Sequence, residues 1–387
     1  MIRLKKNSDR RVRKGHQWVF SNEIADPPIP ELEPGSLHEL RDWRGEFLGM
    51  VYANPASLIT ARILSRKKVD IDALFFEERI KTALQLRTRL FPDRDNYRLV
   101  FGESDFLPGL VVDRYGDVLV VQSLTAGMDR LMDAATEALV ETLSPAGIFL
   151  RNDSHARTLE GLTEEKRLVH GAVPVNVTIN SWGLSFLVDI LNGQKTGFFL
   201  DQESNRPLMR QYVFPGARVL DLFCYTGAWG IHAAAAGASE VTVVDSSRGA
   251  LNLAIANAGL NHMEDRLIPV KELAIEFLKK SREQWDVVIL DPPAFIKSRT
   301  RIKEGLKGYV DVNRRGLLRV NPGGILVSCS CSHHLDAATF EGALLSAAQQ
   351  GGRDLRILDV RGQGPDHPIL LSMPETRYLK VVVAQVM

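Results

Sequence analysis

The sequence has little cysteine: 387 residues contain only three, Cys224, Cys329 and Cys331. An odd and sparse set argues against a disulfide framework, and free thiols are typical of a reducing cytoplasm, where we therefore place the protein. Long apolar runs are absent too, so we expect no signal peptide, no membrane span and no membrane partner. The formal charge is only +1, with 45% hydrophobic and 25% charged residues, which is typical of a globular protein.

The sequence also lacks the G-x-G-x-x-G motif that cradles a pyrophosphate. Instead, residues 218–245 carry an apolar run around Asp221, a turn with Gly227, an Ala-rich helix and a second apolar run that ends in Asp245. This order is typical of a doubly wound α/β domain, whose ligand lies at the carboxyl ends of the strands. An acid about 20 residues after the turn often binds a ribose hydroxyl. The pattern favours a nucleoside without phosphates, such as S-adenosylmethionine, although an ordinary βαβ unit is the alternative.

The hydrophobic pattern divides the chain into three predicted domains. Residues 1–70 consist of short strand-like runs and Pro-rich turns, which predict a small β-barrel. Its first fourteen residues hold seven Lys or Arg and one acid, as a nucleic-acid surface would, or as a solvated basic terminus would. Residues 71–175 predict an α+β domain without obvious chemistry. Residues 176–387 alternate between strands and helices, which predicts a mainly parallel sheet.

An Asp-Pro-Pro sequence, Asp291-Pro292-Pro293, follows a predicted strand. Two prolines stiffen the backbone and remove amide donors, so they form a rigid wall beside the carboxylate. A planar base can lie against such a wall, and Phe295 can stack on it. A simple break between strand and loop is the alternative. Because a ligand-binding fold precedes the motif, we favour a substrate site.

Cys329 and Cys331 share one face of another predicted strand, which should end at the same edge. No second ligand pair has metal-binding spacing, so we expect no metal. Buried cysteines are most often inert. At this edge, however, a thiolate can attack carbon 6 of a pyrimidine and make carbon 5 nucleophilic enough to take a methyl group. Position alone does not decide which thiol attacks.

Taken together, these motifs resemble the RlmI-type ribosomal RNA large-subunit cytosine-5 methyltransferases over nearly the whole chain. Residues 14–21 (KGHQWVFS) are similar to the start of that family's PUA domain, an RNA-binding β-barrel. Residues 195–202 (KTGFFLDQ), 220–227 (LDLFCYTG) and 291–295 (DPPAF) are similar to its cofactor and substrate motifs, as are residues 307–313 and the tail at 366–368 and 378–380. The resemblance implies three domains in chain order: a PUA-like barrel, a central α+β domain and a class I Rossmann-like methyltransferase domain.

The resemblance also implies residue roles. Cys331 would be the nucleophile, since it holds the family's Ser-Cys-Ser position after Gly323-Gly324, and Asp291 would hold the cytosine edge. Pro292, Pro293 and Phe295 would bind the RNA substrate, and so would Lys14 and Trp18. The residues expected around S-adenosylmethionine are Thr196, Phe198, Phe199, Asp201, Asp221, Phe223, Tyr225, Thr226, Gly227, Asp245, Ser246, Glu272 and Asp291. Glu272 departs from the usual Asp at the adenine position.

We therefore expect 5-methylcytosine formation in large-subunit (23S) ribosomal RNA through a cysteine adduct at carbon 6. Two alternatives stay open. One is methylation of an amino group on RNA, since an Asp-Pro-Pro-aromatic motif also serves exocyclic nitrogens and needs no cysteine. The other is a non-enzymatic RNA-binding assembly factor that retains a cofactor pocket. The sequence leaves the oligomeric state open, with a homodimer as one option.

Overall fold

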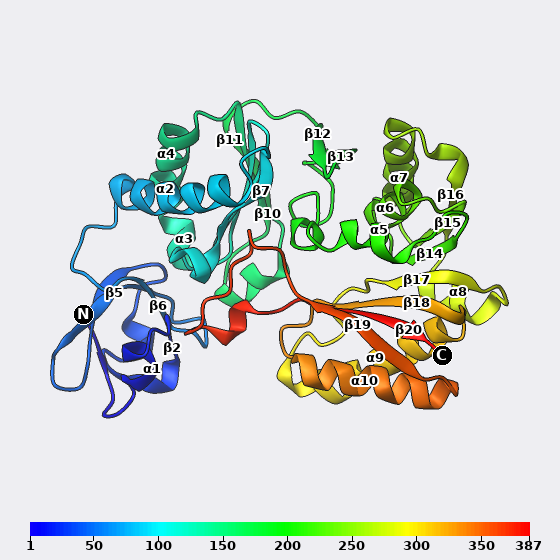
Figure 1. Ribbon diagram of the computed structural model, residues 1–387. Coiled ribbons are helices and arrows are strands. Elements are labelled where there is room, and N and C mark those ends of the chain that lie inside the picture. The colour runs from blue at the N-terminus through cyan, green and yellow to red at the C-terminus, as the bar shows by residue number, and fades with distance from the viewer. The chain divides into compact units, whose positions relative to one another are not determined.

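The computed structural model describes residues 1–387 and divides them into two compact units (Figure 1). The first unit consists of Met1–Ile179, Val188–Leu200 and Pro365–Thr376. The second consists of Asn180–Leu187, Asp201–Gly364 and Arg377–Met387. The proposed boundaries near residues 70 and 175 within this chain stay a prediction.

The N-terminal part of the first unit is a six-stranded mixed sheet. Short alternating runs form its strands, because every second side chain enters a core that includes Ile2, Leu40 and Val51. The strand order is β2-β6-β5-β4-β1-β3, with only β1 and β4 parallel. The elements are β1 (Ile2–Leu4), α1 (Arg10–Arg13), β2 (Trp18–Val19), β3 (Ile24–Asp26), β4 (Leu37–Arg41), β5 (Phe47–Ala53) and β6 (Ala61–Ser65).

A second sheet of the first unit has the order β11-β10-β9-β8-β7 and packs against helices around a separate core. The elements are α2 (Ala73–Leu90), β7 (Asn96–Phe101), β8 (Leu110–Tyr115), β9 (Val118–Ser123), α3 (Ala126–Arg130), α4 (Met132–Leu143), β10 (Gly147–Asn152) and β11 (Glu165–Gly171). The strands β12 (Asn176–Ser181) and β13 (Leu184–Asp189) form a two-stranded sheet.

The second unit is built on a seven-stranded sheet of order β16-β15-β14-β17-β18-β20-β19. Strands β14 to β18 are parallel where they pair, as expected from the alternation with helices, and β20 is antiparallel to both its neighbours. The strands are β14 (Arg218–Leu222), β15 (Glu240–Asp245), β16 (Leu267–Lys271), β17 (Trp285–Leu290), β18 (Val320–Ser330), β19 (Leu355–Arg361) and β20 (Lys380–Val386).

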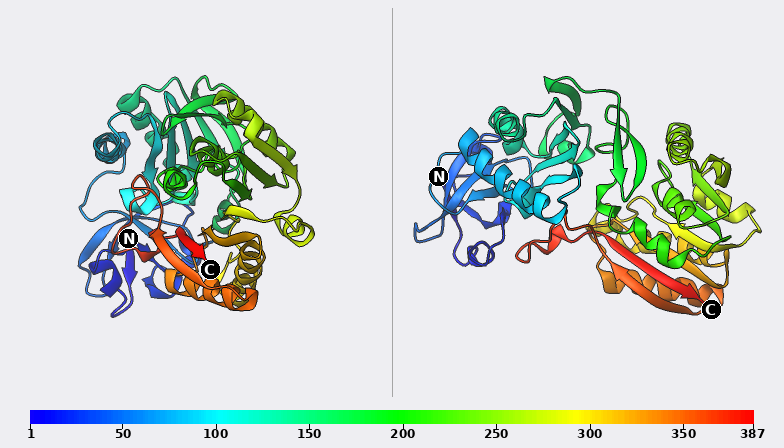
Figure 2. Two further views of the ribbon diagram at one scale, coloured as in Figure 1. Left: turned by 45° about the vertical axis from the view of Figure 1, so that its right-hand side comes forward. Right: turned by 45° about the horizontal axis from the view of Figure 1, so that its top comes forward.

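Helices cover both faces of this sheet, as the doubly wound class requires (Figures 1 and 2). One layer holds α5 (Met209–Tyr212), α6 (Ala228–Ala235) and α7 (Arg248–Leu260), and the other holds α8 (Ala274–Lys280), α9 (Ile302–Leu317) and α10 (Ala337–Gly351). None of the helices has the length and apolar character needed to span a bilayer.

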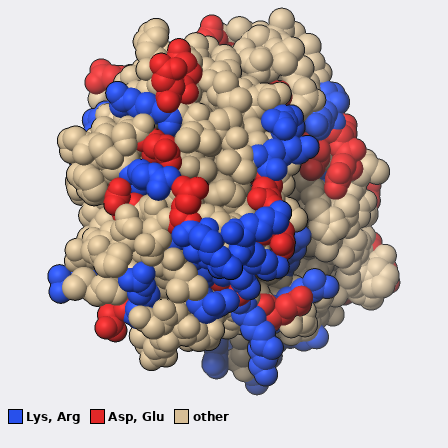
Figure 3. Space-filling model, turned by 90° about the vertical axis from the view of Figure 1, so that its right-hand side faces the viewer, with Lys and Arg blue, Asp and Glu red and all other residues tan.

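Lys and Arg side chains gather together with acids on one face of the second unit (Figure 3). Near the C-terminal ends of α8 and α9, Lys279 pairs with Glu276, Lys280 pairs with Glu272, and Arg315 pairs with Asp311. Exposed ion pairs of this kind contribute little to stability.

Candidate functional site

Four of the expected functional residues lie at the carboxyl ends of neighbouring strands of the second unit. Asp221 is on β14, Asp245 is the last residue of β15, Asp291 follows β17, and Cys331 follows β18. The strands are parallel and adjacent in the order β15-β14-β17-β18. Because parallel strands end at one edge, these three carboxylates and the thiol share that edge of the sheet.

The turn after β14 is shaped by left-handed backbone positions, at Phe223 (φ 62°), Tyr225 (φ 49°) and Gly227 (φ 75°). A side chain at Gly227 would also meet Ala254, since an added Cβ would lie 2.9 Å from the Cβ of that residue. Two strained non-glycine residues in one turn are the pattern found at binding sites. The turn brings the amide of Tyr225 to Asp245, as the next contacts show.

Asp245 is held in place by backbone amides. The Tyr225 amide donates to its Oδ2 at 3.0 Å, and the Ser247 amide donates to its Oδ1 at 2.8 Å. Each carboxylate oxygen keeps a further lone pair, and the side chain is only half-buried. A fixed acceptor at this position is suited to a pair of ribose hydroxyls. Ser246 beside it is exposed.

Asp221 is fully buried and has one oxygen that no group of the protein satisfies. Its Oδ2 accepts the Gly230 amide at 2.9 Å, whereas Oδ1 is buried without a hydrogen-bond partner. Burial raises the pKa of this carboxyl to about 8, with a smaller contribution from the charge of Asp291. Gly230 permits the close approach, because an added Cβ would lie 2.9 Å from Val243 and 3.2 Å from Asp221 Oδ2. An unsatisfied buried carboxylate oxygen is a binding position for a cation or donor.

Asp291 receives two side-chain donors through one oxygen. Trp229 Nε1 donates to Oδ2 at 3.0 Å and Gln202 Nε2 donates to the same atom at 3.1 Å. Gln202 is itself oriented by Asn205, whose Nδ2 donates to Gln202 Oε1 at 2.8 Å. Burial raises the pKa of Asp291 to about 6, although the bond from Trp229 opposes the shift. These two bonds fix the orientation of the carboxylate, and its Oδ1 stays available to a ligand.

The residues after Asp291 lie against α9, and their role as a wall for the base stays a prediction. Pro292 is buried, Pro293 is exposed, and Phe295 is half-buried against Tyr309, with ring centroids 4.8 Å apart. Glycines of α9 let this segment approach: a Cβ on Gly305 would lie 2.3 Å from Ile296 Cγ1 and 2.9 Å from the Phe295 carbonyl oxygen. The segment 292–296 is therefore held directly on α9.

Replacing Gly305 by alanine is expected to destabilise the protein by about 1–3 kcal/mol, because the new methyl group overlaps both a side chain and backbone atoms. As a control, alanine at Gly342 in α10, where an added Cβ meets nothing within 4 Å, should stabilise by about 0.5–1 kcal/mol. Thermal unfolding of both variants measures this. If Gly305→Ala melted at the wild-type temperature, segment 292–296 would have to be able to shift away from α9 to make room for the methyl group.

The two thiols of the C-x-C pair differ in burial. Cys329 is fully buried, and burial raises the pKa of its thiol well above the ordinary value. Cys331 lies just beyond the strand and is partly exposed. Cys224 is buried in the turn after β14, and burial likewise raises the pKa of its thiol. Since the thiolate is the nucleophile, Cys331 alone of the three combines access with a position at the edge.

The serines beside Cys331 are locked by Tyr309. The Ser330 hydroxyl donates to the Tyr309 hydroxyl at 2.8 Å, and the Ser332 hydroxyl lies 2.9 Å from it. The Ile296 amide donates to Ser332 Oγ at 3.2 Å, which ties the end of β18 to the segment after Asp291. The backbone on both sides of the thiol is therefore fixed.

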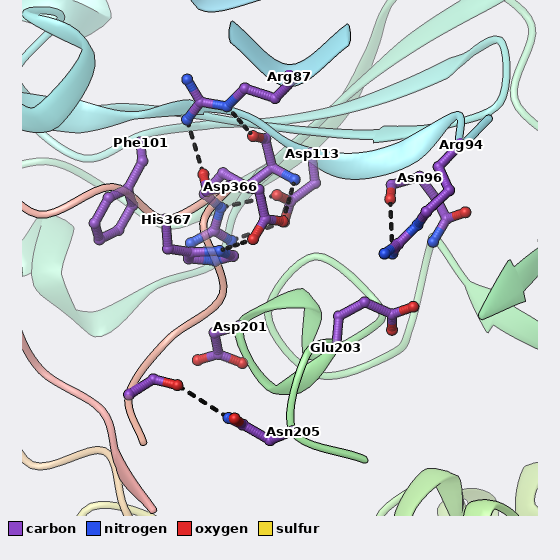
Figure 4. A network of polar contacts seen from close by, with 12 residues as sticks. Arg87, Arg94, Asn96, Phe101, Asp113, Asp201, Glu203, Asn205, Asp366 and His367 are labelled. Carbon is purple, nitrogen blue, oxygen red and sulfur yellow. Dashed lines mark hydrogen bonds and ion pairs between the residues drawn. The ribbon is translucent and has the colours of Figure 1, made fainter. Parts of the chain in front are cut away.

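Residues expected to cover the cofactor are anchored within the first unit. Thr196 is buried and its hydroxyl donates to Asp113 Oδ2 at 2.5 Å. Asp113 in turn accepts two bonds from Arg98, whose amide donates to Asp366 at 3.0 Å, beside His367 (Figure 4). Phe198 is buried and Phe199 is half-buried with Lys195 over its ring. Roles for these three residues in cofactor binding stay a prediction.

The remaining expected residues are placed as follows. Asp201 is buried in the second unit and accepts the Tyr378 hydroxyl at 2.7 Å. Glu272 forms an ion pair with Lys280, so its carboxylate already has a partner, while its amide donates to Asp245 O at 3.1 Å. Lys14 is exposed after α1, and Trp18 donates its indole N–H to Glu103 at 2.7 Å. Thr226 is buried, and its carbonyl accepts Asn257 Nδ2 at 3.1 Å.

Sequence reasoning missed several residues of this edge. Trp229 and Gln202 stand inside the stretches singled out above, but nothing in their spacing connects them to Asp291. Tyr309 and Lys380 lie in stretches that carry the family resemblance, which was the only available signal for them. Lys380, at the start of β20, donates its Nζ to the carbonyl of Ser332, the residue after Cys331, at 2.6 Å.

The chain is similar to known proteins over its whole length. Residues 2–66 match a PUA-like domain, and residues 168–368 match the S-adenosylmethionine-dependent methyltransferase family. Ribosomal RNA large subunit methyltransferase I of Shewanella frigidimarina is 36% identical over 393 aligned positions, which cover 100% of this chain and 99% of the relative. A SAM-dependent methyltransferase from Streptococcus mutans covers 100% of both chains with a TM-score of 0.86 at 22% identity. A methyltransferase structure complexed with SAH has a TM-score of 0.87 at 22% identity. The structural likenesses support the fold.

Proposed function

Because the chain belongs to the S-adenosylmethionine-dependent methyltransferase family, its cofactor is S-adenosylmethionine, and we propose that it forms 5-methylcytosine in large-subunit ribosomal RNA. The observation that carries this proposal is the position of Cys331. A partly exposed thiol ends one strand, and the Asp-Pro-Pro-Ala-Phe segment follows the neighbouring strand. A thiol at this position can add to carbon 6 of a pyrimidine and so activate carbon 5, whereas methylation of an amino group needs no thiol.

The chain's residues suit the cofactor. The unsatisfied Oδ1 of Asp221 supplies an acceptor for a cationic or donor group, and Asp245 supplies fixed acceptors for ribose hydroxyls. Phe223, Tyr225 and Gly227 shape the turn between them. When bound, the cofactor supplies an electrophilic methyl group for carbon 5 of the base. We assign the adenine end to the neighbourhood of Glu272 through backbone contacts, because its carboxylate pairs with Lys280.

The residues at the carboxyl edge of the sheet can carry out the steps of this reaction. The target cytosine leaves its stack, since its carbons 5 and 6 are out of reach inside a helix. Asp291 and the proline wall hold its polar edge and ring, and Phe295 closes the face. The Cys331 thiolate adds to carbon 6, which turns the 5,6 double bond into a nucleophilic carbon 5. After methylation a base takes the carbon-5 proton, the double bond re-forms, and the thiolate leaves.

The first unit supports an RNA substrate. Residues 2–66 match a PUA-like domain, and its first residues are strongly basic, as expected for a surface that contacts phosphates. We propose that Lys14 and Trp18 take part in this contact. The relative from Shewanella frigidimarina carries large-subunit ribosomal RNA in its name, which supports that class of substrate. A cytoplasmic location is part of the same proposal.

Methyl transfer from labelled S-adenosylmethionine to unmodified large-subunit ribosomal RNA tests the function. Wild-type protein is expected to give 5-methylcytidine after digestion to nucleosides, with small-subunit RNA as the control substrate. An N-methylated nucleoside would instead support the amino-group alternative, which needs Asp291 and Phe295 but no thiol. Cofactor binding without methyl transfer to any RNA would support a binding or assembly role.

A further inference from the structure

Lys380 is a buried cation placed beside the end of β18. In the antiparallel register Lys380 lies opposite Ser330, the residue before Cys331. Only 6% of its surface is exposed. Its Nζ donates to the carbonyl oxygens of Ser332 at 2.6 Å and Tyr378 at 2.7 Å. The ammonium is therefore fixed between the carbonyl of the residue after Cys331 and the carbonyl of Tyr378, which lies on its own segment.

This ammonium has a donor to spare and no carboxylate in ion-pair contact. An ammonium has three N–H groups, and the two carbonyls use two of them. The negative groups whose charges act on it are Cys331, in the thiolate form, and Asp336. Asp336 is also the N-cap of α10 and accepts the Thr339 amide at 2.7 Å. Burying an ammonium without a carboxylate is costly, so such a lysine usually has a functional partner.

Other groups near Cys331 are already engaged. The hydroxyls of Ser330 and Ser332 are bonded to Tyr309, and the ring of His333 stacks on Tyr378 with centroids 5.0 Å apart. Burial lowers the pKa of Lys380 to about 8, while the thiolate of Cys331 raises it. The same attraction must stabilise the thiolate by an equal amount, because the interaction is mutual.

We propose that Lys380 is the positioning cation that stabilises the Cys331 thiolate and so prepares it for attack on carbon 6. The S–H bond breaks, its proton goes to solvent, and the negative sulfur stays next to an ammonium that remains protonated. The proposal deepens the proposed function and rests on it. A lysine that only caps the two carbonyls would stabilise the fold without affecting the thiol.

The test is the pH dependence of Cys331 alkylation by iodoacetamide, followed by mass spectrometry of the Cys331 peptide. In the wild type the midpoint is expected below about 8.5, the ordinary value for a cysteine. Lys380→Gln should raise the midpoint by about one pH unit, which lowers the alkylation rate at pH 7 about tenfold. Lys380→Arg keeps the charge and should stay near the wild type. Lys297→Gln, which removes an exposed lysine after Phe295, is the matched control.

An unchanged midpoint in folded Lys380→Gln would overturn the proposal. So would a wild-type midpoint at or above 8.5, which needs no variant and therefore holds even where Lys380→Gln fails to fold. In methylation assays Lys380→Gln should lower kcat at pH 7 with KM for RNA unchanged, and recover at pH 9. The two hypotheses fail separately: persistent methylation by Cys331→Ala would reject the adduct mechanism, whereas alkylation reports on the Lys380–Cys331 interaction alone.

Discussion

Cys331→Ala is expected to abolish methyl transfer, with a loss of roughly three orders of magnitude or more, while cofactor binding and folding stay near the wild type. Removing the attacking atom of a covalent mechanism leaves no alternative route at the same carbon. The side chain is partly exposed and lies beyond the end of β18, so its truncation leaves no sealed cavity. Methyl transfer from labelled cofactor to unmodified RNA measures the loss.

The other two cysteines provide matched controls. Cys329→Ala and Cys224→Ala remove buried thiols whose pKa values are raised by burial. Each should cost about 1 kcal/mol of stability and leave methyl transfer within a few-fold of the wild type. An RNA that carries 5-fluorocytosine adds a second readout, because fluorine at carbon 5 cannot leave as a proton. The wild type should form a covalent complex with it, and Cys331→Ala should form none.

Retained activity in Cys331→Ala would contradict the adduct at this residue. If activity were then lost in Cys329→Ala, the strand end would have to open enough to expose a residue that is fully buried here. If activity survived in both, an N-methylated product would support the amino-group alternative. Product analysis on the same samples separates the two outcomes.

The positions of the three acids followed from the sequence because they depend on local pattern. Each apolar run that predicts a strand reaches its end at or beside an acid, and alternation with helices predicts parallel neighbours. Parallel strands end at one edge, so Asp221, Asp245 and Asp291 had to converge. The strand order itself was not readable, nor was β20, which returns antiparallel between β18 and β19.

The hydrogen bonds that orient these groups could not be predicted from the sequence, because they join distant parts of the chain. Gln202 and Trp229 meet Asp291 across 89 and 62 positions. Lys380 meets the Ser332 carbonyl across 48 positions. Spacing alone likewise left Cys329 and Cys331 equivalent on one strand face. The difference between them arises where β18 ends, at Ser330, which leaves one thiol inside the sheet and the other beyond it.

The affinity for S-adenosylmethionine is expected to rise with pH up to about 8 and then level off, and Asp221→Asn is expected to remove this dependence. The pKa of Asp221 is raised from 3.8 to about 8 by burial, so the carboxyl of the cofactor-free protein is largely protonated at pH 7. A bound cation favours the ionised form. Binding therefore releases a proton, and affinity should fall up to tenfold for each pH unit below 8. Titration calorimetry in buffers of different ionisation enthalpy measures both the affinity and the proton.

Asp221→Asn keeps the shape and can still accept the Gly230 amide, but it carries no charge. At pH 8.5 it should bind the cofactor about 10–100-fold more weakly, because a hydrogen bond to a charged group is lost. Asp291, with a pKa raised to about 6, titrates lower, so the comparison is made between pH 7 and pH 9. A wild-type affinity that is flat over this range would show that the Asp221 carboxyl is already ionised before the cofactor arrives.

The same substitution should have the opposite effect on the empty protein. Between pH 3.8 and about 8 the folded state holds a proton on Asp221 that the unfolded chain has lost, so stability falls as pH rises through this window. Asparagine has no such proton, and cofactor-free Asp221→Asn should melt higher than the wild type at pH 8, with a gap that narrows toward pH 5. A variant that binds the cofactor more weakly but is more stable when empty would show that this buried carboxyl destabilises the fold and is needed for cofactor binding. If Asp221→Asn lost affinity and melting temperature together at pH 8, the charge of the carboxylate would instead stabilise the empty fold, through a stronger bond from the Gly230 amide.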